Sequence, residues 1–382
     1  MKKFCLLLSL LFILITAAGC NTKSTKGSET MQDFYVRTDY DRGSMTANFL
    51  STENNSKLSV EMEKIAEGDE YITYKTKADP DKFDRVYLTR GKDNNTIQLA
   101  FNKYIGGYHI SGSGIMPFVY DEAEPKIEFK RIPLKYKDGD KDILVWTPES
   151  YDENDKDTKY SVIYMPDGQN LFVDSATSYG CWGVAQSVKS MMAQSDNKCI
   201  IVGIETYANR NSDLTPDIGE AVVGDESYKN GAGIDFSNFV CDTVVPYIEE
   251  NYNVYTDPSH NFLCGSSSGG LEVFYIGMEH QDKFGTIGAL SPAFELFSED
   301  TWKNYLKGIT VDENSPFIYI YCGNNDELEQ FLYIESIKMN DYLKDIGYPK
   351  EKIVTKIYEE GIHNEIYWRA VFPDFLKYAF GE

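Results

Sequence analysis

The feature that most constrains the fold is a long alternation of short apolar runs and amphipathic segments from about residue 126 to the end of the chain. The apolar runs are expected to be strands, at 142–147, 160–165, 199–205, 261–264, 285–291, 316–322 and 352–358. Segments of helical periodicity separate or follow them, at 182–194, 235–251, 268–280, 298–307, 327–346 and 367–379. Because near-continuous apolar strands are buried on both faces, the pattern predicts a doubly wound α/β fold with a mostly parallel sheet.

Residues 32–120 have a different pattern. Short runs typical of strands, such as DFYVRT, MTANFL and DRVYLT, are separated by Asn, Asp, Gly and Ser. Their regular spacing, without a helical stretch of similar strength, predicts a small all-β sandwich domain. The acidic stretch 121–125 is expected to be a linker to the α/β domain at 126–382.

The first residues are typical of an export signal. Two lysines precede an apolar run at 4–17 that is too short to span a bilayer stably, and the string AAGC ending at Cys20 is similar to a bacterial lipobox. We expect residues 1–19 to be a lipoprotein signal peptide, Cys20 to be lipidated, and the polar residues 20–31 to form a flexible tether. This predicts attachment to the extracellular face of the bacterial cell membrane, with plain secretion as the alternative.

The net charge bears on the kind of partner, and the cysteines bear on disulfides and metal binding. The net charge of −23 disfavours a surface that neutralises phosphates, so nucleic acid is not expected as a partner. Five of the seven cysteines remain if Cys5 is cleaved off and Cys20 is lipidated, and an odd number cannot all pair within one chain. Cys199, Cys264 and Cys322 lie in or beside apolar runs, which favours buried free thiols. No CxxC pair suggests zinc.

The string GSSSG at 265–269 fits the nucleophile-elbow pattern GxSxG and stands between an expected strand and an expected helix. Its flanking glycines would let the strand and the helix approach closely while the middle serine adopts a strained backbone. The pattern therefore predicts Ser267 as a nucleophile. The helix N-terminus behind it would stabilise an oxyanion, with the Ser268 N–H as the first donor.

A serine hydroxyl needs a base at neutral pH, and the chain has four histidines. The order in this fold is nucleophile, acid, histidine, so only His280 and His363 are candidates. His280 would lie about 18 Å along the helix axis from Ser267 and is expected to be a surface residue or a helix cap. His363 follows the last strand in a loop, and we predict that it is the base.

The acid is expected after the strand at 316–322. Asp326 is predicted to fix the tautomer of the His363 ring, while its neighbour Glu327 is the alternative acid and is expected to cap the following helix. The second oxyanion donor is expected to be a backbone N–H at Gln169, in the loop after the strand at 160–165. The alternative is that this loop is merely a tight turn. Such a mechanism requires no cofactor and no metal.

Several strings resemble the putative-esterase family of α/β hydrolases, which includes enterochelin-type, feruloyl and acetyl-xylan esterases and mycolyltransferases. They are YMPDGQNLF (164–172), SYGCWGVA (178–185), IVGIE (201–205), RNSDLTP (210–216), GSSSGG (265–270), YCGNNDE (321–327) and GIHNEIYW (361–368). The resemblance spans about residues 126–382. It implies the α/β-hydrolase fold, a triad of Ser267, Asp326 and His363, and an oxyanion hole formed by the amides of Gln169 and Ser268.

The resulting hypothesis is a serine carboxylic-ester hydrolase that acts through an acyl-enzyme on acyl or feruloyl esters of polysaccharide. Trp182 and Trp368, beside the oxyanion and histidine loops, are expected to line the substrate pocket. The segment 206–233 is expected to be an active-site loop. A siderophore esterase of the enterochelin type and an acyltransferase are alternatives. A different class is a non-catalytic surface lipoprotein that binds glycan through its β domain, which looks like a carbohydrate-binding module.

Overall fold

The structure is a computed structural model and describes residues 31–39, 43–68, 71–90, 93–94, 97–111, 114–120, 127–173, 180–207, 209–222, 225–229 and 231–381. The expected signal peptide, Cys20, the tether up to residue 30 and the linker at 121–125 lie outside the described residues. Within the described ranges, no helix is long and apolar enough to cross a membrane.

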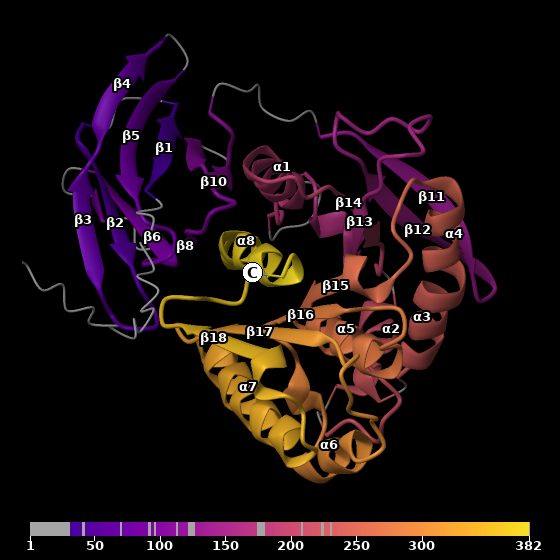
Figure 1. Cartoon of the computed structure of the whole chain (residues 1–382). Helices are drawn as coiled ribbons and strands as arrows, with labels where there is room; N and C mark the ends of the chain where they lie inside the picture. Colours follow the sequence, from indigo (N-terminus) through magenta and orange to yellow (C-terminus); the bar gives the residue numbers. More distant parts are fainter. Residues whose placement is uncertain are drawn as a thin grey trace, which may run out of the picture.

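The N-terminal region consists of strands packed in two sheets, as the sequence predicted (Figure 1). One sheet has the order β10-β9-β1-β5-β4 and the other β3-β2-β6-β7, with β8 paired to β6. In the core between them, Phe34 meets Phe49 and Phe101 edge-on, and the rings of Phe49 and Phe101 are tilted against each other. The strands are β1 (Gln32–Thr38), β2 (Met45–Leu50), β3 (Lys57–Glu61), β4 (Glu63–Glu67), β5 (Ile72–Ala78), β6 (Arg85–Arg90), β7 (Asp93–Asn94), β8 (Leu99–Ala100), β9 (Gly107–Ser111) and β10 (Gly114–Pro117).

The C-terminal region is built on an eight-stranded sheet of order β11-β12-β14-β13-β15-β16-β17-β18. Pairs from β14 to β18 are parallel, whereas β11 and β12 add an antiparallel edge. The strand β11 was not predicted because half of its residues are exposed, among them Lys130, Arg131 and Lys135. The strands are β11 (Phe129–Tyr136), β12 (Gly139–Trp146), β13 (Ser161–Pro166), β14 (Cys199–Ile204), β15 (Asn261–Ser266), β16 (Thr286–Leu290), β17 (Phe317–Gly323) and β18 (Ile353–Tyr358).

Helices cover both faces of this sheet, which confirms the predicted α/β-hydrolase fold (Figure 1). One apolar core joins a sheet face to α3–α7, and a second joins the other face to α1 and α8. The helices are α1 (Val184–Gln194), α2 (Arg210–Asp213), α3 (Gly233–Phe239), α4 (Val245–Asn251), α5 (Ser268–Glu279), α6 (Glu299–Leu306), α7 (Glu327–Asp345) and α8 (Glu365–Ala379). Short 3-10 turns are η1 (Gly168–Asn170), η2 (Glu226–Tyr228), η4 (Pro258–His260), η5 (Phe294–Leu296) and η6 (Lys350–Lys352).

The helix expected at 235–251 is divided in three. A π-helical turn, η3 (Val240–Val244), separates α3 from α4. Pro246 stands in the first turn of α4, where its missing N–H is tolerated. The wider turn before it lets the chain avoid a clash between the proline ring and the preceding helix.

The last helix, α8, joins the two regions. In Figure 1 it lies between the N-terminal sandwich and the main sheet, and its Ala370 is part of the sandwich core while Phe372 and Phe375 face the sheet. Arg85 of β6 is fully buried and pairs with Asp374 of α8. The sandwich therefore packs on the α/β domain through a shared buried interface.

Candidate active site

The nucleophile elbow forms where β15 ends and α5 begins. Ser267 adopts φ 57° and ψ −128° between them and is partly exposed. A side chain at Gly265 would meet the Gly269 carbonyl oxygen at 2.6 Å, so position 265 requires glycine for the close approach of the strand and the helix. Ser268 is the first residue of α5, which leaves its backbone N–H without an acceptor inside the helix.

The oxyanion loop, Asp167–Asn170, follows β13. Asp167 has a left-handed backbone (φ 56°), and its carboxylate accepts two parallel hydrogen bonds from Arg210 Nε and Nη2, each 2.8 Å long. The Thr206 hydroxyl and the Gln169 side-chain amide also donate to this carboxylate. Burial alone would raise the pKa of Asp167, but the charge and hydrogen bonds of Arg210 outweigh it and hold the pKa below its usual value. The loop is therefore braced by an ionised carboxylate.

Arg210 was not singled out from the sequence. It lies in α2, inside the segment 206–233 that was expected to be an active-site loop, and only the string RNSDLTP pointed to it. The part of this segment that the structure describes therefore reaches the oxyanion loop directly. The role of the Gln169 N–H as an oxyanion donor stays a prediction.

The imidazole of His363 is oriented by Glu329. The His363 Nδ1 and Glu329 Oε1 atoms are 2.9 Å apart, and the Glu329 side chain is fully buried. Its other oxygen accepts a 2.7 Å hydrogen bond from the Gly323 N–H at the end of β17. Because an ionised carboxylate can only accept, Nδ1 carries the proton and Nε2 is free to act as a base.

The prediction that Asp326 is the partner of the His363 ring is therefore wrong. Asp326 is the N-cap of α7: one oxygen accepts from the Glu329 N–H at 2.8 Å, and the other accepts from the backbone N–H of His363 at 2.8 Å. The two oxygens of Asp326 thus hold the backbone at Glu329 and the backbone at His363. Glu327, the alternative acid, is exposed and is not the cap.

The serine and histidine loops meet around Trp368. The Trp368 ring lies 4.9 Å from the His363 ring, and its Nε1 donates to the Ser291 hydroxyl at 3.1 Å. Ser291 follows Leu290, whose carbonyl accepts the Ser267 N–H at 3.0 Å. Among the described residues, no hydrogen bond joins the Ser267 hydroxyl to His363. The catalytic pairing of these two side chains stays a prediction.

Trp182 and Trp368 do not line an open pocket, contrary to expectation. Their exposed fractions are 2% and 5%, and their ring centroids are 5.7 Å apart. Indole rings beside polar loops suggested contact with substrate, but both rings are instead used as core. Trp182 packs on Trp368, and Trp368 contacts the His363 ring.

The cysteines and His280 lie where the sequence predicted them. Five described cysteines are buried free thiols, as predicted for three of them: Cys181, Cys199, Cys241, Cys264 and Cys322. His280 is the C-cap of α5 and contacts the Ser237 hydroxyl, far from the elbow along the helix. Within the described ranges, no cluster of three His, Cys, Asp or Glu side chains could hold a metal.

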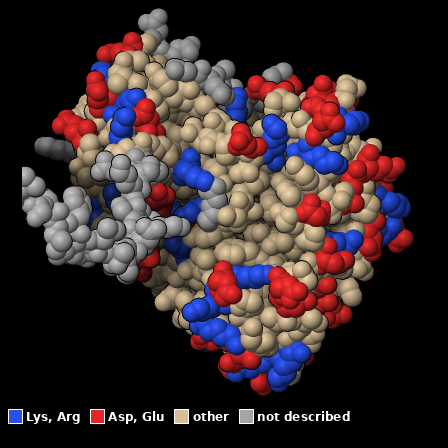
Figure 2. Space-filling model, in the orientation of Figure 1, with Lys and Arg blue, Asp and Glu red and all other residues tan. Residues whose placement is uncertain are grey.

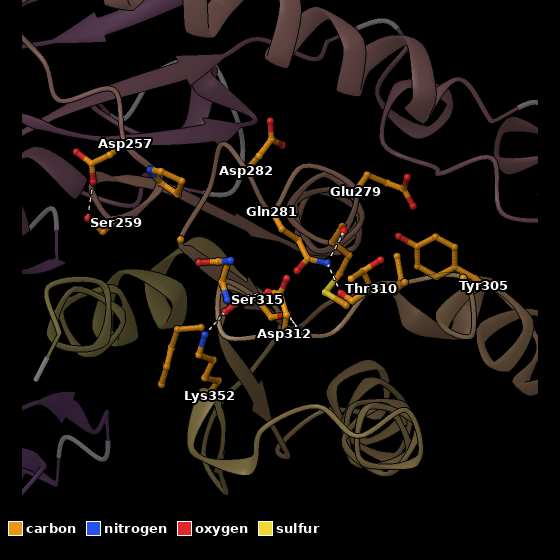
Figure 3. Close-up of a pocket in the computed structure, with 17 residues that line it drawn as sticks. Asp257, Ser259, Glu279, Gln281, Asp282, Tyr305, Thr310, Asp312, Ser315 and Lys352 are labelled. Atoms are coloured by element: carbon orange, nitrogen blue, oxygen red, sulfur yellow. Dashed lines mark hydrogen bonds between the residues drawn. The ribbon is translucent and has the colours of Figure 1, made fainter.

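A hollow with a volume of about 1010 Å³ lies where the parallel strands start, and Figure 3 shows the residues that line it. Its lining includes Pro258, Gly285, Phe317 and Lys352, which precede or begin β15 to β18. Ser267 follows the other end of β15 and is not among the lining residues.

Figure 2 shows acidic and basic side chains interspersed over the face in view. That nucleic acid is not a partner stays a prediction.

Comparisons with known proteins show the family and the fold of this chain. The family model described as "Putative esterase" matches residues 137–379. The uncharacterised protein YbbA of Bacillus subtilis is 20% identical over 256 residues, which covers 65% of this chain and 96% of that protein. A ferulic acid esterase from Anaeromyces mucronatus, in complex with ferulic acid, is 24% identical, covers 69% of this chain and 93% of its own, and has a TM-score of 0.51.

An enterobactin esterase structure from Shigella flexneri covers more of the molecule. It is 16% identical, covers 91% of this chain and 92% of its own, and has a TM-score of 0.53. At this identity the similarity concerns the fold. Its coverage extends beyond the α/β region to the N-terminal strands.

Proposed function

Since this chain belongs to the putative-esterase family, we propose that it is a serine carboxylic-ester hydrolase that acts through an acyl-enzyme. The observation that carries the proposal is the strained Ser267 backbone at a helix N-terminus, together with an imidazole whose Nδ1 is held by Glu329. These groups are the three parts that serine acyl transfer needs: a nucleophile, a base and a group that orients the base.

In the proposed reaction, Ser267 Oγ attacks the ester carbonyl carbon while His363 Nε2 takes the hydroxyl proton. The negative charge on the carbonyl oxygen is stabilised by the backbone N–H groups of Ser268 and Gln169. His363 then passes the proton to the leaving alcohol, and the acyl group remains on Ser267. Water, activated by the same imidazole, releases the acid and restores the serine. Glu329 stabilises the imidazolium in both halves.

For the substrate we propose acyl or feruloyl esters linked to polysaccharide. The similarity to a ferulic acid esterase complex supports an aryl acyl group. Exposed apolar side chains also follow the carboxyl ends of β13, β14 and β18, at Val173, Tyr207 and Ile366. Such side chains suit an aromatic or apolar acyl group better than a charged one. Attachment to the extracellular face through a lipid on Cys20 would bring the enzyme to polymers outside the cell.

A catecholate siderophore ester is the second candidate. It is favoured by the enterobactin esterase structure, which covers 91% of this chain and includes its N-terminal strands. Acyl transfer to a sugar would use the same groups with a different acceptor. A glycan-binding protein without catalysis, recognising its ligand through the β domain, is the proposal of another class.

The test is hydrolysis by the mature chain of acetylated xylan, feruloylated arabinoxylan, a ferric catecholate ester and p-nitrophenyl acetate, each beside the Ser267→Ala variant. We expect release of acid from at least one polysaccharide ester and loss of all activity in the variant. Cleavage of the catecholate ester alone would transfer the assignment to the second candidate. Full hydrolysis by Ser267→Ala would remove the serine mechanism.

A further inference from the structure

Glu365 is a buried carboxyl group beside the catalytic groups that the proposed mechanism does not use. It is the first residue of α8, two positions after His363, and its exposed fraction is 5%. Asn364 caps the helix by accepting from the N–H groups of Ile366 and Tyr367. The helix start, and with it the backbone that carries Glu365, is therefore fixed relative to His363.

Glu365 reaches across the site to the oxyanion loop. Its Oε1 accepts a 3.1 Å hydrogen bond from Nδ2 of Asn170, a residue 195 positions away in the sequence. The Asn170 Oδ1 is buried and has no hydrogen-bond partner. Glu365 is therefore the one side chain in the described part of the molecule that holds this amide.

Asn170 in turn sets the shape of the oxyanion loop. Its N–H donates to the Asp167 carbonyl at 2.9 Å, and its own carbonyl accepts from the Trp182 N–H at 2.9 Å. Gln169, whose N–H is the expected oxyanion donor, lies between these anchored positions in η1. A shift of Asn170 would therefore move the donor that faces the substrate carbonyl.

We propose that Glu365 is a positioning residue that fixes the oxyanion loop relative to His363 through its hydrogen bond to Asn170. This inference rests on the proposed function, because it concerns the distance between the base and the oxyanion donor. Misplacement of such a group by about 1 Å can cost about a hundredfold in rate. Glu365 does not need to touch the substrate for this role, and its carboxyl group is almost fully buried.

The charges that face Glu365 come from three elements. Asp167 of the oxyanion loop opposes its ionisation, while His363 and Arg210 of α2 favour it. Burial is the largest effect, and together these influences raise the pKa of Glu365 to about 7. An ionised carboxylate accepts the Asn170 hydrogen bond more strongly than a neutral one, so the link strengthens as the pH rises through neutrality.

The test compares Glu365→Ala, Glu365→Gln, Asn170→Ala and the double variant Glu365→Ala/Asn170→Ala, with p-nitrophenyl acetate as substrate. Glu351→Ala is the matched control, because Glu351 is an exposed glutamate at the other end of β18. We expect Glu365→Ala to lower kcat about ten- to a hundredfold with KM within about twofold, and Glu365→Gln to recover most of the loss. The double variant should be no slower than the slower single variant.

A loss confined to KM would overturn the inference. So would a double variant whose fold-loss in kcat equals the product of the fold-losses of Glu365→Ala and Asn170→Ala. The ratio of wild-type to Glu365→Gln kcat should change near pH 7, and a ratio constant from pH 5 to 9 would also contradict it. If Glu365→Ala does not fold, Glu365→Gln and Asn170→Ala carry the same comparison. Failure of the wild-type chain to hydrolyse esters would instead be a failure of the proposed function.

Discussion

Glu329 Oε1 lies 2.9 Å from Nδ1 of His363, and the same carboxylate accepts the Gly323 N–H through its other oxygen. Glu329 is the third residue of α7, so its side chain belongs to the first turn of that helix. The acid of the proposed triad thus lies in the first turn of α7 and not in the loop between β17 and α7.

Substitutions of Glu329 and of Asp326 should lower kcat by different amounts. Glu329→Gln keeps the shape but cannot hold the histidine in the required tautomer, so we expect kcat to fall about 10²- to 10⁴-fold. Asp326→Asn retains an oxygen for capping and should lower kcat much less. Steady-state kinetics with p-nitrophenyl acetate measure both, and a larger loss in Asp326→Asn would return the role of acid to that residue.

For kcat, the two parallel hydrogen bonds from Arg210 to Asp167 should matter more than the positive charge of Arg210. Arg210→Lys keeps the positive charge but cannot make two parallel bonds, so the oxyanion loop loses its brace. We expect kcat to fall about tenfold or more with little change in thermal stability. Arg131→Lys is the matched control, because Arg131 lies on the edge strand β11 and also pairs with two carboxylates, those of Asp142 and Glu205. Equal activity in both variants would contradict this role.

Glu272 of α5 should make the protein less stable as the pH rises. It is fully buried, neither carboxyl oxygen has a hydrogen-bond partner, and burial, with the nearby Asp213 charge, raises its pKa well above 4.5. In the unfolded chain this group loses its proton near the ordinary value, whereas the folded protein retains it. The penalty therefore begins above pH 4.5 and grows until the pKa of the folded state is reached.

Glu272→Gln removes that ionisation. The variant should gain unfolding free energy relative to the wild type by up to about 1.4 kcal/mol per pH unit above this threshold, and the difference should vanish toward pH 4. Urea unfolding from pH 4 to 8 measures it. Glu279→Gln, at an exposed position of the same helix, should show no such trend. A pH-independent difference for Glu272→Gln would show that the buried carboxyl group is ionised or paired.

The interface between the sandwich and the α/β domain should be sensitive to loss of one charge. Arg85 Nη2 lies 3.4 Å from Asp374, the guanidinium stacks 3.6 Å from the Tyr358 ring centroid, and the Tyr319 hydroxyl donates to the same carboxylate at 2.9 Å. Arg85→Met leaves the buried Asp374 carboxylate without a counter-charge, so we expect a loss of about 3 to 5 kcal/mol in unfolding free energy. Asp374→Leu added to Arg85→Met should recover part of it. Additive losses would show that the two charges are not coupled.

Much of the fold could be predicted because its signals are local. The apolar runs of β13 to β17 and the glycines around Ser267 each satisfy one dominant requirement, burial on both faces or close backbone approach. Strand β11 was missed because it is an edge strand whose polar side chains alternate toward solvent. Its place is set by pairing with β12, which is tertiary information.

The histidine was predictable and its partner was not, for a physical reason. His363 was isolated by elimination, since few histidines follow the serine. Asp326 and Glu329 are both carboxylates near one helix start, and the spacing D-x-x-E is also that of a capping box. That spacing could have suggested that Asp326 caps the helix and that the side chain at the third position points back toward the loop. Arg210 and Glu365 act across the site, and no local pattern indicates their partners.

The most direct test of the proposed mechanism is identification of the nucleophilic residue. The mature chain is incubated with a fluorophosphonate, which forms a stable adduct with an activated serine, and is analysed by intact mass and peptide mapping. We predict one adduct per chain, located on Ser267, with labelling slowed strongly in Glu329→Gln and absent in Ser267→Ala. An adduct on another residue, or unlabelled protein that still hydrolyses p-nitrophenyl acetate, would contradict the proposed mechanism.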